Sequence, residues 1–389
     1  MKKILFTIKS NSKIHKLWKN FLLFPPDGFE YVDCNCSFLD FSKVKNVKET
    51  LKSKIINILY KIKRRIPLMI YLYNFSENKR FSRYIDTHNP DLIYCINGKI
   101  YYGNKPWVVD FENPSVFFDY NLKAFKKYIK KNEEILSREN CKAIIAYSEE
   151  GKKSFLANFT SEKIKSKVCV IPNVIYSPKN VKKIEHNGFN ILFTGTSNLE
   201  DDFYSRGGKE VVHVFIKLSK KYQDIKLIIR CKVPKKEKEL LKGKNVEIYE
   251  NILSKKEFDA LFLKSDLYLF PAYVGYALSV LEAMGFGLPV ITSDLLENGE
   301  PVEDTINGFK VKPKKIKYVL PLIPDYFFKR KPTFILDHDY VNGIVEKVEF
   351  LYNRPELCKK ISENNINKVR KNYNIVVKNK ILGDIFKNN

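Results

Sequence analysis

The chain has 389 residues, of which 44% are hydrophobic and 29% charged. This composition excludes a disordered protein, and the length predicts two globular α/β domains. The net charge is +25. Such a basic chain attracts phosphates on nucleotides, lipids or nucleic acid, or it simply carries a lysine-rich solvated surface, and composition leaves both readings open.

The seven cysteines are scattered, none forms a CxxC pair, and the five histidines show no metal-ligand spacing. We therefore expect free thiols in a reducing cytoplasm and no metal site. The opening residues, MKKILFTI, are too short for a signal peptide and predict a buried strand. The apolar stretch 66–75 is too short to span a bilayer.

Short apolar runs alternate with longer amphipathic ones in the first half of the chain, which is typical of βαβ units. Helices are expected at about 46–64, 76–88 and 122–138, and Ser148 followed by two glutamates predicts a helix N-cap. The expected strands are 3–8, 91–97, 107–111, 142–148 and 167–172.

A polar stretch at 177–190 breaks this alternation and predicts a linker, after which a second series begins. Its expected strands are 190–195, 225–230, 246–250, 267–271 and 289–294, and its expected helices are 207–222, 235–241, 255–264, 277–287 and 339–352. The sequence thus predicts an α/β protein with two doubly wound, Rossmann-like domains, 1–180 and 185–355, that face each other across a cleft. A helical segment, 356–389, is expected to pack back toward the N-terminal domain.

The segment 271–294, PAYVGYALSVLEAMGFGLPVITSD, carries the clearest chemistry. A strand ends at Pro271, and Gly275 leaves room for a ligand beside the start of the next helix, where free N–H groups bind anions. Glu282 lies one turn into this helix among apolar residues. Its carboxylate either reaches solvent or binds a donor group such as the hydroxyls of a ribose.

This segment resembles the donor-site motif of GT-B fold glycosyltransferases of family 4 (glycosyl transferases group 1), in which a glutamate before L-E-A-M and the glutamate within it both bind donor. The resemblance implies that Glu282 binds the donor ribose. It also implies that Gly275, Tyr276, Ala277 and Leu278 lie against the sugar and phosphates. Val274 stands where the first glutamate of the family is expected, so sugar specificity or activity departs from the family pattern here.

The segment ILFTGTSNLEDDFYSRGGKEVVHVF resembles the strand, Gly-x-Arg, loop and Lys-Gly-Gly segment with which the same family grips the donor diphosphate. Gly195 matches the first glycine, and Thr196 replaces the usual arginine. Arg206 falls on the lysine position, and Lys209 follows it closely. A guanidinium binds phosphate in a bidentate manner, so Arg206 is a plausible substitute, and the alternative is a solvated loop residue.

The resemblance extends over about residues 140–312 and places Ile252 and Leu253 near the nucleotide base. The N-terminal domain offers Asn97, Asp110 and Glu112 at strand ends. These residues either contact the acceptor or cap turns.

Residues 43–65 combine lysines and arginines with isoleucines at helical spacing. Such a helix lies on an anionic membrane or packs as an ordinary surface helix. The localisation expected is therefore cytoplasmic, with peripheral contact at the inner membrane face left open.

Taken together, the sequence predicts an enzyme that moves a sugar from a nucleotide diphosphate donor to a hydroxyl of a glycan, lipid-linked or small-molecule acceptor. The resemblance implies retention of anomeric configuration, catalytic roles for Arg206 and Glu282, and neither metal nor cofactor. One alternative is a degenerate protein that binds nucleotide sugar without turnover. The other is a nucleic-acid-binding protein, for which the sequence holds no motif.

Overall fold

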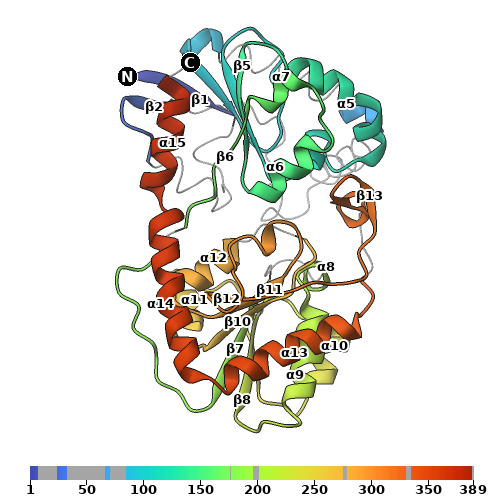
Figure 1. The fold of residues 1–389 in the computed structure, drawn as a ribbon, viewed down its shortest axis with the longest axis vertical. Helices are drawn as coiled ribbons and strands as arrows, with labels where there is room; N and C mark the ends of the chain where they lie inside the picture. Colours follow the sequence, from blue (N-terminus) through green and yellow to red (C-terminus); the bar gives the residue numbers. More distant parts are fainter. Residues whose placement is uncertain are drawn as a thin grey trace, which may run out of the picture. The chain divides into compact units, whose positions relative to one another are not determined.

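The computed structural model describes residues 1–7, 24–32, 66–70, 85–175, 177–195, 201–274, 278–329 and 334–387. The helix expected at 46–64 and the basic segment 43–65 lie outside these residues, as does most of the helix expected at 76–88. The chain forms two compact units, each of which is described by itself (Figure 1). Unit 1 comprises Met1–Val174, Tyr318–Phe328 and Ile375–Asn389, and unit 2 comprises Ile175–Lys317 and Lys329–Asn374.

Unit 1 contains a parallel six-stranded sheet in the order β2-β1-β3-β4-β5-β6. Adjacent residues along its strands face opposite sides, and both sides are buried: Leu5 packs into one core cluster, whereas Ile4 and Phe6 pack into the other. Burial on both faces explains why these strands are continuous apolar runs. The strands are β1 (Lys2–Phe6), β2 (Phe29–Val32), β3 (Leu92–Cys95), β4 (Trp107–Phe111), β5 (Cys141–Ala146) and β6 (Val168–Val170).

Helices cover the two faces of this sheet. On one face, Phe125 and Phe155 belong to the larger cluster; on the other, Leu382 and Phe386 of the C-terminal helix pack against β1 and β3. As expected, Ser148 caps a helix, because its hydroxyl accepts the Gly151 N–H at 2.9 Å. The helical segments of unit 1 are η1 (Pro114–Phe118), α5 (Leu122–Leu136), α6 (Glu149–Leu156), α7 (Glu162–Lys165) and α15 (Ile375–Lys387).

A short excursion, residues 318–328, leaves the chain of unit 2 and joins unit 1. It forms the antiparallel pair β13 (Tyr318–Leu320) and β14 (Ile323–Pro324), followed by η3 (Asp325–Phe328). Ile323 is buried in the larger cluster of unit 1, and the Asn158 side chain donates to the Pro321 carbonyl at 2.9 Å. The sequence analysis placed this segment within the second domain, because short proline-containing strands give no clear periodicity.

Unit 2 contains a second parallel sheet of six strands, in the order β12-β11-β10-β7-β8-β9. Its strands are β7 (Phe189–Thr194), β8 (Ile225–Arg230), β9 (Val246–Ile248), β10 (Leu267–Phe270), β11 (Val290–Ser293) and β12 (Gly308–Val311). All ten strands expected from the sequence are present, and β2 and β12 are additional edge strands. The expected α/β class with two doubly wound domains is therefore confirmed.

The helices of unit 2 lie in two layers (Figure 1): α9, α10 and α13 pack together in one, and α12 packs against α14 in the other. The helical segments are α8 (Asp201–Ser205), α9 (Gly208–Leu218), α10 (Lys235–Leu241), α11 (Lys255–Leu263), α12 (Leu278–Gly285), η2 (Leu296–Asn298), α13 (His338–Tyr352) and α14 (Pro355–Asn372). The helical segment expected at 356–389 is in fact two helices, α14 and α15. It breaks at Tyr373, whose carbonyl accepts the Ile175 N–H at 3.1 Å where the chain passes from unit 2 to unit 1.

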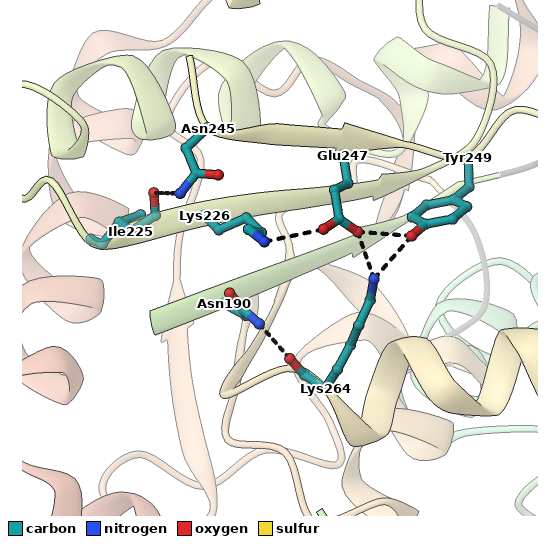
Figure 2. A network of polar contacts seen from close by, with 7 residues as sticks. All are labelled: Asn190, Ile225, Lys226, Asn245, Glu247, Tyr249 and Lys264. Atoms are coloured by element: carbon teal, nitrogen blue, oxygen red, sulfur yellow. Dashed lines mark hydrogen bonds and ion pairs between the residues drawn. The ribbon is translucent and has the colours of Figure 1, made fainter. Parts of the chain in front are cut away.

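A network of paired charges fastens the edge strand β9 to the rest of unit 2, as Figure 2 shows. The Glu247 carboxylate accepts hydrogen bonds from Lys264 Nζ at 2.5 Å, Tyr249 Oη at 2.8 Å and Lys226 Nζ at 3.1 Å. Partial burial alone would raise the pKa of Glu247, but these donors outweigh burial and lower it to about 2. The segment that enters β10 is thereby tied to β8 and β9.

Candidate functional site

The strand order of unit 2 contains one topological switch point, between β7 and β10. The chain starts in the middle at β7, runs outward through β8 and β9, returns to β10 and runs outward again to β12. In sheets of this kind, ligands bind beyond the carboxyl ends of the two strands where the order reverses. The segment after β7, which begins at Gly195, and the segment 271–274 after β10 therefore mark the candidate site.

Hydrogen bonds join the approach to α9 to the segment after β10. The Ser205 carbonyl accepts the backbone N–H groups of Tyr273 at 2.9 Å and Val274 at 3.2 Å. In addition, Arg206 Nη1 donates to the Val274 carbonyl at 3.2 Å. Arg206 is thus held beside the segment that follows β10, at the switch point.

Gly207 is required for this close approach. Its φ of +79° lies in the left-handed region, and a Cβ at this position would be 2.2 Å from the Pro271 carbonyl oxygen. Any other residue would push the start of α9 away from the end of β10. The glycine pair that the sequence analysis used as a motif therefore has a structural cause.

Arg206 and the first turn of α9 present positive charge without a matching negative partner. The half-buried guanidinium of Arg206 lies 5.9 Å from the centre of the Phe270 ring, and within the described part of the chain it forms no ion pair. Gly207, the N-cap residue of α9, has no side chain with which to cap the helix. Lys209 is half-buried in this first turn. A helix start next to two cations favours an anion such as phosphate.

Glu282 is half-buried in the second turn of α12. Its negative charge acts on two residues of this sheet, Tyr268 of β10 and Arg230 at the end of β8. It adds to burial in raising the pKa of Tyr268, and it favours the charged form of Arg230. Tyr268 is itself fixed, because its hydroxyl lies 2.7 Å from Thr194 Oγ1 on β7. Glu282 therefore belongs to the same site as Arg206, whose charge also acts on Tyr268.

Arg230 is a site residue that the sequence analysis missed. It is the last residue of β8, and its Nη1 donates to the Gly195 carbonyl at 3.3 Å, while its guanidinium lies 5.1 Å from the centre of the Phe258 ring. Burial lowers the pKa of Arg230, and Cys231 and Glu282 oppose this shift. The signal was available: a charged residue at the carboxyl end of a predicted parallel strand lies where ligands bind.

The remaining donor-side residues occupy the same edge of the sheet to different degrees. Gly195 directly follows β7, and a Cβ there would be 3.0 Å from Cβ of Cys231, so only glycine allows β7 and β8 to end side by side without a shift. Val274 is half-buried, Leu278 begins α12, and Gly275, Tyr276 and Ala277 lie outside the described residues. Ile252 and Leu253 precede α11; the first is 77% exposed and the second half-buried.

Behind the site, Glu210 supports the segment after β10. Its Oε1 accepts the Tyr273 hydroxyl at 2.9 Å, and its Oε2 is buried with no hydrogen-bond donor in the described part of the chain. Burial raises the pKa of Glu210 to about 7, although the Tyr273 hydrogen bond lowers it. The protonation state of the buried Glu210 carboxyl therefore affects the hydrogen bond that holds Tyr273.

The three acceptor-side candidates lie in unit 1. Asn97 follows β3 with a left-handed φ of +50°, and its N–H donates to Asp110 Oδ1 at 2.6 Å. Asp110 is buried, which raises its pKa to about 6, and it faces the buried Lys378 of α15, whose pKa burial lowers to about 8.

Glu112 is half-buried beyond the end of β4 and accepts a hydrogen bond from the Tyr120 hydroxyl. It also accepts one from the Asn113 side chain at 3.3 Å. Asn97, Asp110 and Glu112 all follow or end neighbouring strands of one parallel sheet, at its carboxyl edge. Their carboxylates already hold intramolecular partners.

Two further features concern metals and membranes. Among the described residues, no group of three or more His, Cys, Asp or Glu side chains is arranged to hold a metal ion. In the same part of the chain, every helix is too short or too polar to cross a bilayer.

Part of the chain, mostly in unit 2, is similar to a known protein family. Residues 188–319 match the sequence model of the family described as "Glycosyl transferases group 1". The match includes the switch point, Arg206, Arg230 and Glu282. No curated protein matches the sequence.

Solved structures share the fold of the whole chain at low sequence identity. A glycosyltransferase from Rickettsia africae ESF-5 is 15% identical with a TM-score of 0.61, covering 100% of this chain and 98% of that chain. Sucrose-phosphate synthase from Thermosynechococcus elongatus is 12% identical with a TM-score of 0.62, covering 100% and 99%. HepE from Anabaena, solved in complex with UDP-glucose, is 12% identical with a TM-score of 0.59, covering 100% of both chains.

The chain therefore has the GT-B fold of these glycosyltransferases, and its residues 188–319 are similar to the glycosyl transferases group 1 family.

Proposed function

We propose that the protein transfers a sugar from a nucleoside diphosphate donor to a hydroxyl group of an acceptor. The donor binds to unit 2 beyond the carboxyl ends of β7 and β10. The observation that carries this proposal is the placement of Arg206 at the switch point, where it bonds to the Val274 carbonyl and forms no ion pair with a described residue. A half-buried cation at this position calls for an anionic ligand.

The chemistry follows from the charge that develops on the leaving group. When the bond between sugar and diphosphate breaks, negative charge accumulates on the phosphate oxygens, and preorganised cations and N–H groups lower the barrier. Arg206, Lys209 and the open start of α9 provide such groups. The proposal needs no metal or cofactor, because these groups supply the positive charge, and turnover is expected to persist after treatment with EDTA.

The other donor-side residues bind the rest of the donor. Glu282 accepts hydrogen bonds from the ribose hydroxyls, and Ile252 and Leu253 lie toward the base. Gly195 and Val274–Leu278 lie against the phosphates and sugar. We further propose retention of anomeric configuration and an acceptor that is a sugar or a lipid-linked glycan, bound by unit 1 near Asn97, Asp110 and Glu112. Support for these finer points comes from the motif resemblance.

A second candidate function is binding of a nucleotide sugar without turnover. Two departures from the family motif favour it: Val274 replaces a glutamate and Thr196 replaces an arginine. The family match and the shared fold argue against a nucleic-acid-binding protein, the third alternative.

The test is a panel of UDP-, GDP- and ADP-sugars, including deoxy sugars, incubated with the protein and a mixture of sugar and lipid-linked acceptors. Release of nucleoside diphosphate from at least one donor, lost in Arg206→Gln, is expected. Donor binding by calorimetry without any release would favour the second candidate. Absence of both binding and release would contradict the proposal.

A further inference from the structure

The positive charge of Arg230 forms no ion pair with a carboxylate in the described part of the chain. The side chain is half-buried at the end of β8, and its guanidinium has five N–H donors. Only Nη1 has a hydrogen-bond acceptor in the described chain, the Gly195 carbonyl at 3.3 Å, and Nε is buried without one. No described carboxylate lies within ion-pair distance of it. Glu282 acts on Arg230 only through its field.

The cost of this arrangement indicates a ligand. A guanidinium removed from water without a counter-charge destabilises the folded protein, whereas the same group becomes favourable when an anion binds to it. The ring of Phe258, 5.1 Å from the guanidinium carbon, holds the side chain in place and leaves most of its donors unused. Arg230 therefore has the features of a preorganised anion-binding group.

Arg230 and Arg206 lie at the same edge of one sheet. Both lie at the carboxyl edge of unit 2's sheet: Arg230 bonds to Gly195, which opens the connection after β7, and Arg206 closes that same connection before α9. The residue that follows Gly195 is Thr196, at which the family motif has an arginine. A guanidinium that reaches Gly195 from the neighbouring strand brings positive charge back to this end of the connection.

We infer that Arg230 is the second cation of the donor site and that it binds the diphosphate of the nucleotide together with Arg206. The inference rests on the proposed function and deepens it, because it assigns the diphosphate to two arginines, one at the end of β8 and one just before α9. Since a guanidinium contacts phosphate through a fork of N–H groups, lysine at 230 would keep the charge but lose the second hydrogen bond.

The experiment is isothermal titration calorimetry of the full-length native protein, Arg230→Gln and Arg230→Lys with UDP, GDP and ADP. Each nucleotide that binds is then compared with its own nucleoside. Arg354→Gln is the matched control, because Arg354 also donates to a backbone carbonyl and lies over an aromatic ring, that of Phe350 at 3.9 Å. It belongs to the end of α13 and not to the edge of the sheet.

We expect Arg230→Gln to weaken diphosphate binding about 10- to 100-fold, the loss of one charge-assisted contact. Arg230→Lys should fall between Arg230→Gln and the native protein, and Arg354→Gln should match the native protein. The nucleoside should bind Arg230→Gln and native protein equally, because it has no phosphate. This last comparison separates a phosphate contact from general damage to the site.

Two results would overturn the inference while leaving the proposed function intact: equal diphosphate affinity in native protein and Arg230→Gln, or an equal loss for diphosphate and nucleoside. If the native protein binds none of the three diphosphates, the proposed function fails and the inference with it. A melting temperature of Arg230→Gln close to that of Arg354→Gln shows that the variant is folded, and Arg230→Lys gives the same comparison if it is not.

Discussion

Unit 2 contains two charged regions built on opposite principles. In the Glu247 network, a carboxylate on β9 is matched by Lys226 and Lys264 within 3.1 Å (Figure 2). At the carboxyl edge of the same sheet, Arg206 and Arg230 are half-buried and have no ion pair in the described chain. In the first region, opposite charges are paired with each other. In the second region, two positive charges share one edge of the sheet, and neither forms an ion pair in the described chain.

The two regions therefore have different roles: the paired charges stabilise the fold, and the unpaired cations are available to bind a ligand. A matched network contributes to stability and offers little to a ligand, because its donors and acceptors are occupied. Unmatched guanidiniums reduce stability but bind an anion strongly when one arrives. Substitutions in the Glu247 network should therefore change the free energy of unfolding, whereas substitutions of Arg206 or Arg230 should change ligand binding.

The largest effect on activity is expected at the carboxyl edge of the unit 2 sheet. Arg206→Gln should lower donor turnover about 100-fold or more, because it removes a preorganised cation from the leaving group. Lys209→Gln should cost no more than about 10-fold, since its flexible ammonium contributes less orientation. Initial rates of nucleoside diphosphate release would measure both, and equal rates in the two variants would mean that the diphosphate is misplaced.

Glu282→Ala should weaken donor binding by about 10-fold while leaving the unfolding transition unchanged, because it removes a hydrogen-bond acceptor for the ribose. The measurement is calorimetric titration of the nucleoside diphosphate, with circular dichroism melting as the fold control. An unchanged affinity would remove Glu282 from the site.

Glu210→Gln tests how the buried carboxyl that binds Tyr273 affects stability. Because its pKa rises on folding from about 4.5 to about 7, Glu210 favours the folded state below pH 4.5, and this contribution is lost as the pH rises through 7. Relative to the native protein, the variant should gain stability between pH 5 and pH 8, by on the order of 1 kcal/mol. Urea unfolding at both pH values measures this. Identical pH profiles would contradict the assignment.

Glu247→Gln should show the reverse dependence on pH. Its pKa falls on folding from 4.5 to about 2, so its stabilisation is present above pH 4.5 and is lost as the pH falls toward 2. At pH 7 we expect a loss of about 1 kcal/mol in unfolding free energy, limited by solvent screening. Donor affinity should not change. A stability loss that stays constant from pH 7 to pH 3 would argue against this role.

The smallest effect expected concerns the choice of donor. Val274→Glu restores the carboxylate of the family motif next to Arg206, whose Nη1 is bound to the Val274 carbonyl. We expect a shift of a few-fold in preference from deoxy toward fully hydroxylated sugars, because a buried carboxylate needs a hydroxyl partner. The check is relative kcat/KM across the donor panel. An identical preference would mean that position 274 does not face the sugar.

The sequence predicted the repeating elements of the fold well and the irregular ones poorly. All ten expected strands exist because most of them are runs of apolar residues buried on both faces, a pattern that is local. The excursion 318–328 into unit 1 and the break at Tyr373 could not be predicted, because both depend on contacts with distant segments such as Asn158 and Ile175.

The candidate site likewise contains residues that the sequence predicted and residues that only the fold reveals. Arg206 and Glu282 were predicted because motif spacing carries them. Arg230 was not predicted because its relation to Gly195 is a contact across strands, between positions 35 apart in sequence. Asp110 was proposed for the acceptor from its place near a strand end, whereas the electrostatic influence of the buried Lys378 of α15 on it is visible only in the fold.

The central claim, that unmatched cations at the carboxyl edge of unit 2 bind a nucleoside diphosphate, is tested most directly by one titration series. UDP, GDP and ADP are titrated by calorimetry into native protein, Arg206→Gln and Glu247→Gln. The account predicts that at least one nucleotide binds the native protein, that Glu247→Gln binds it equally well, and that Arg206→Gln binds it about 10-fold or more weakly. Equal affinity in native protein and Arg206→Gln, or no binding to the native protein, would contradict the account.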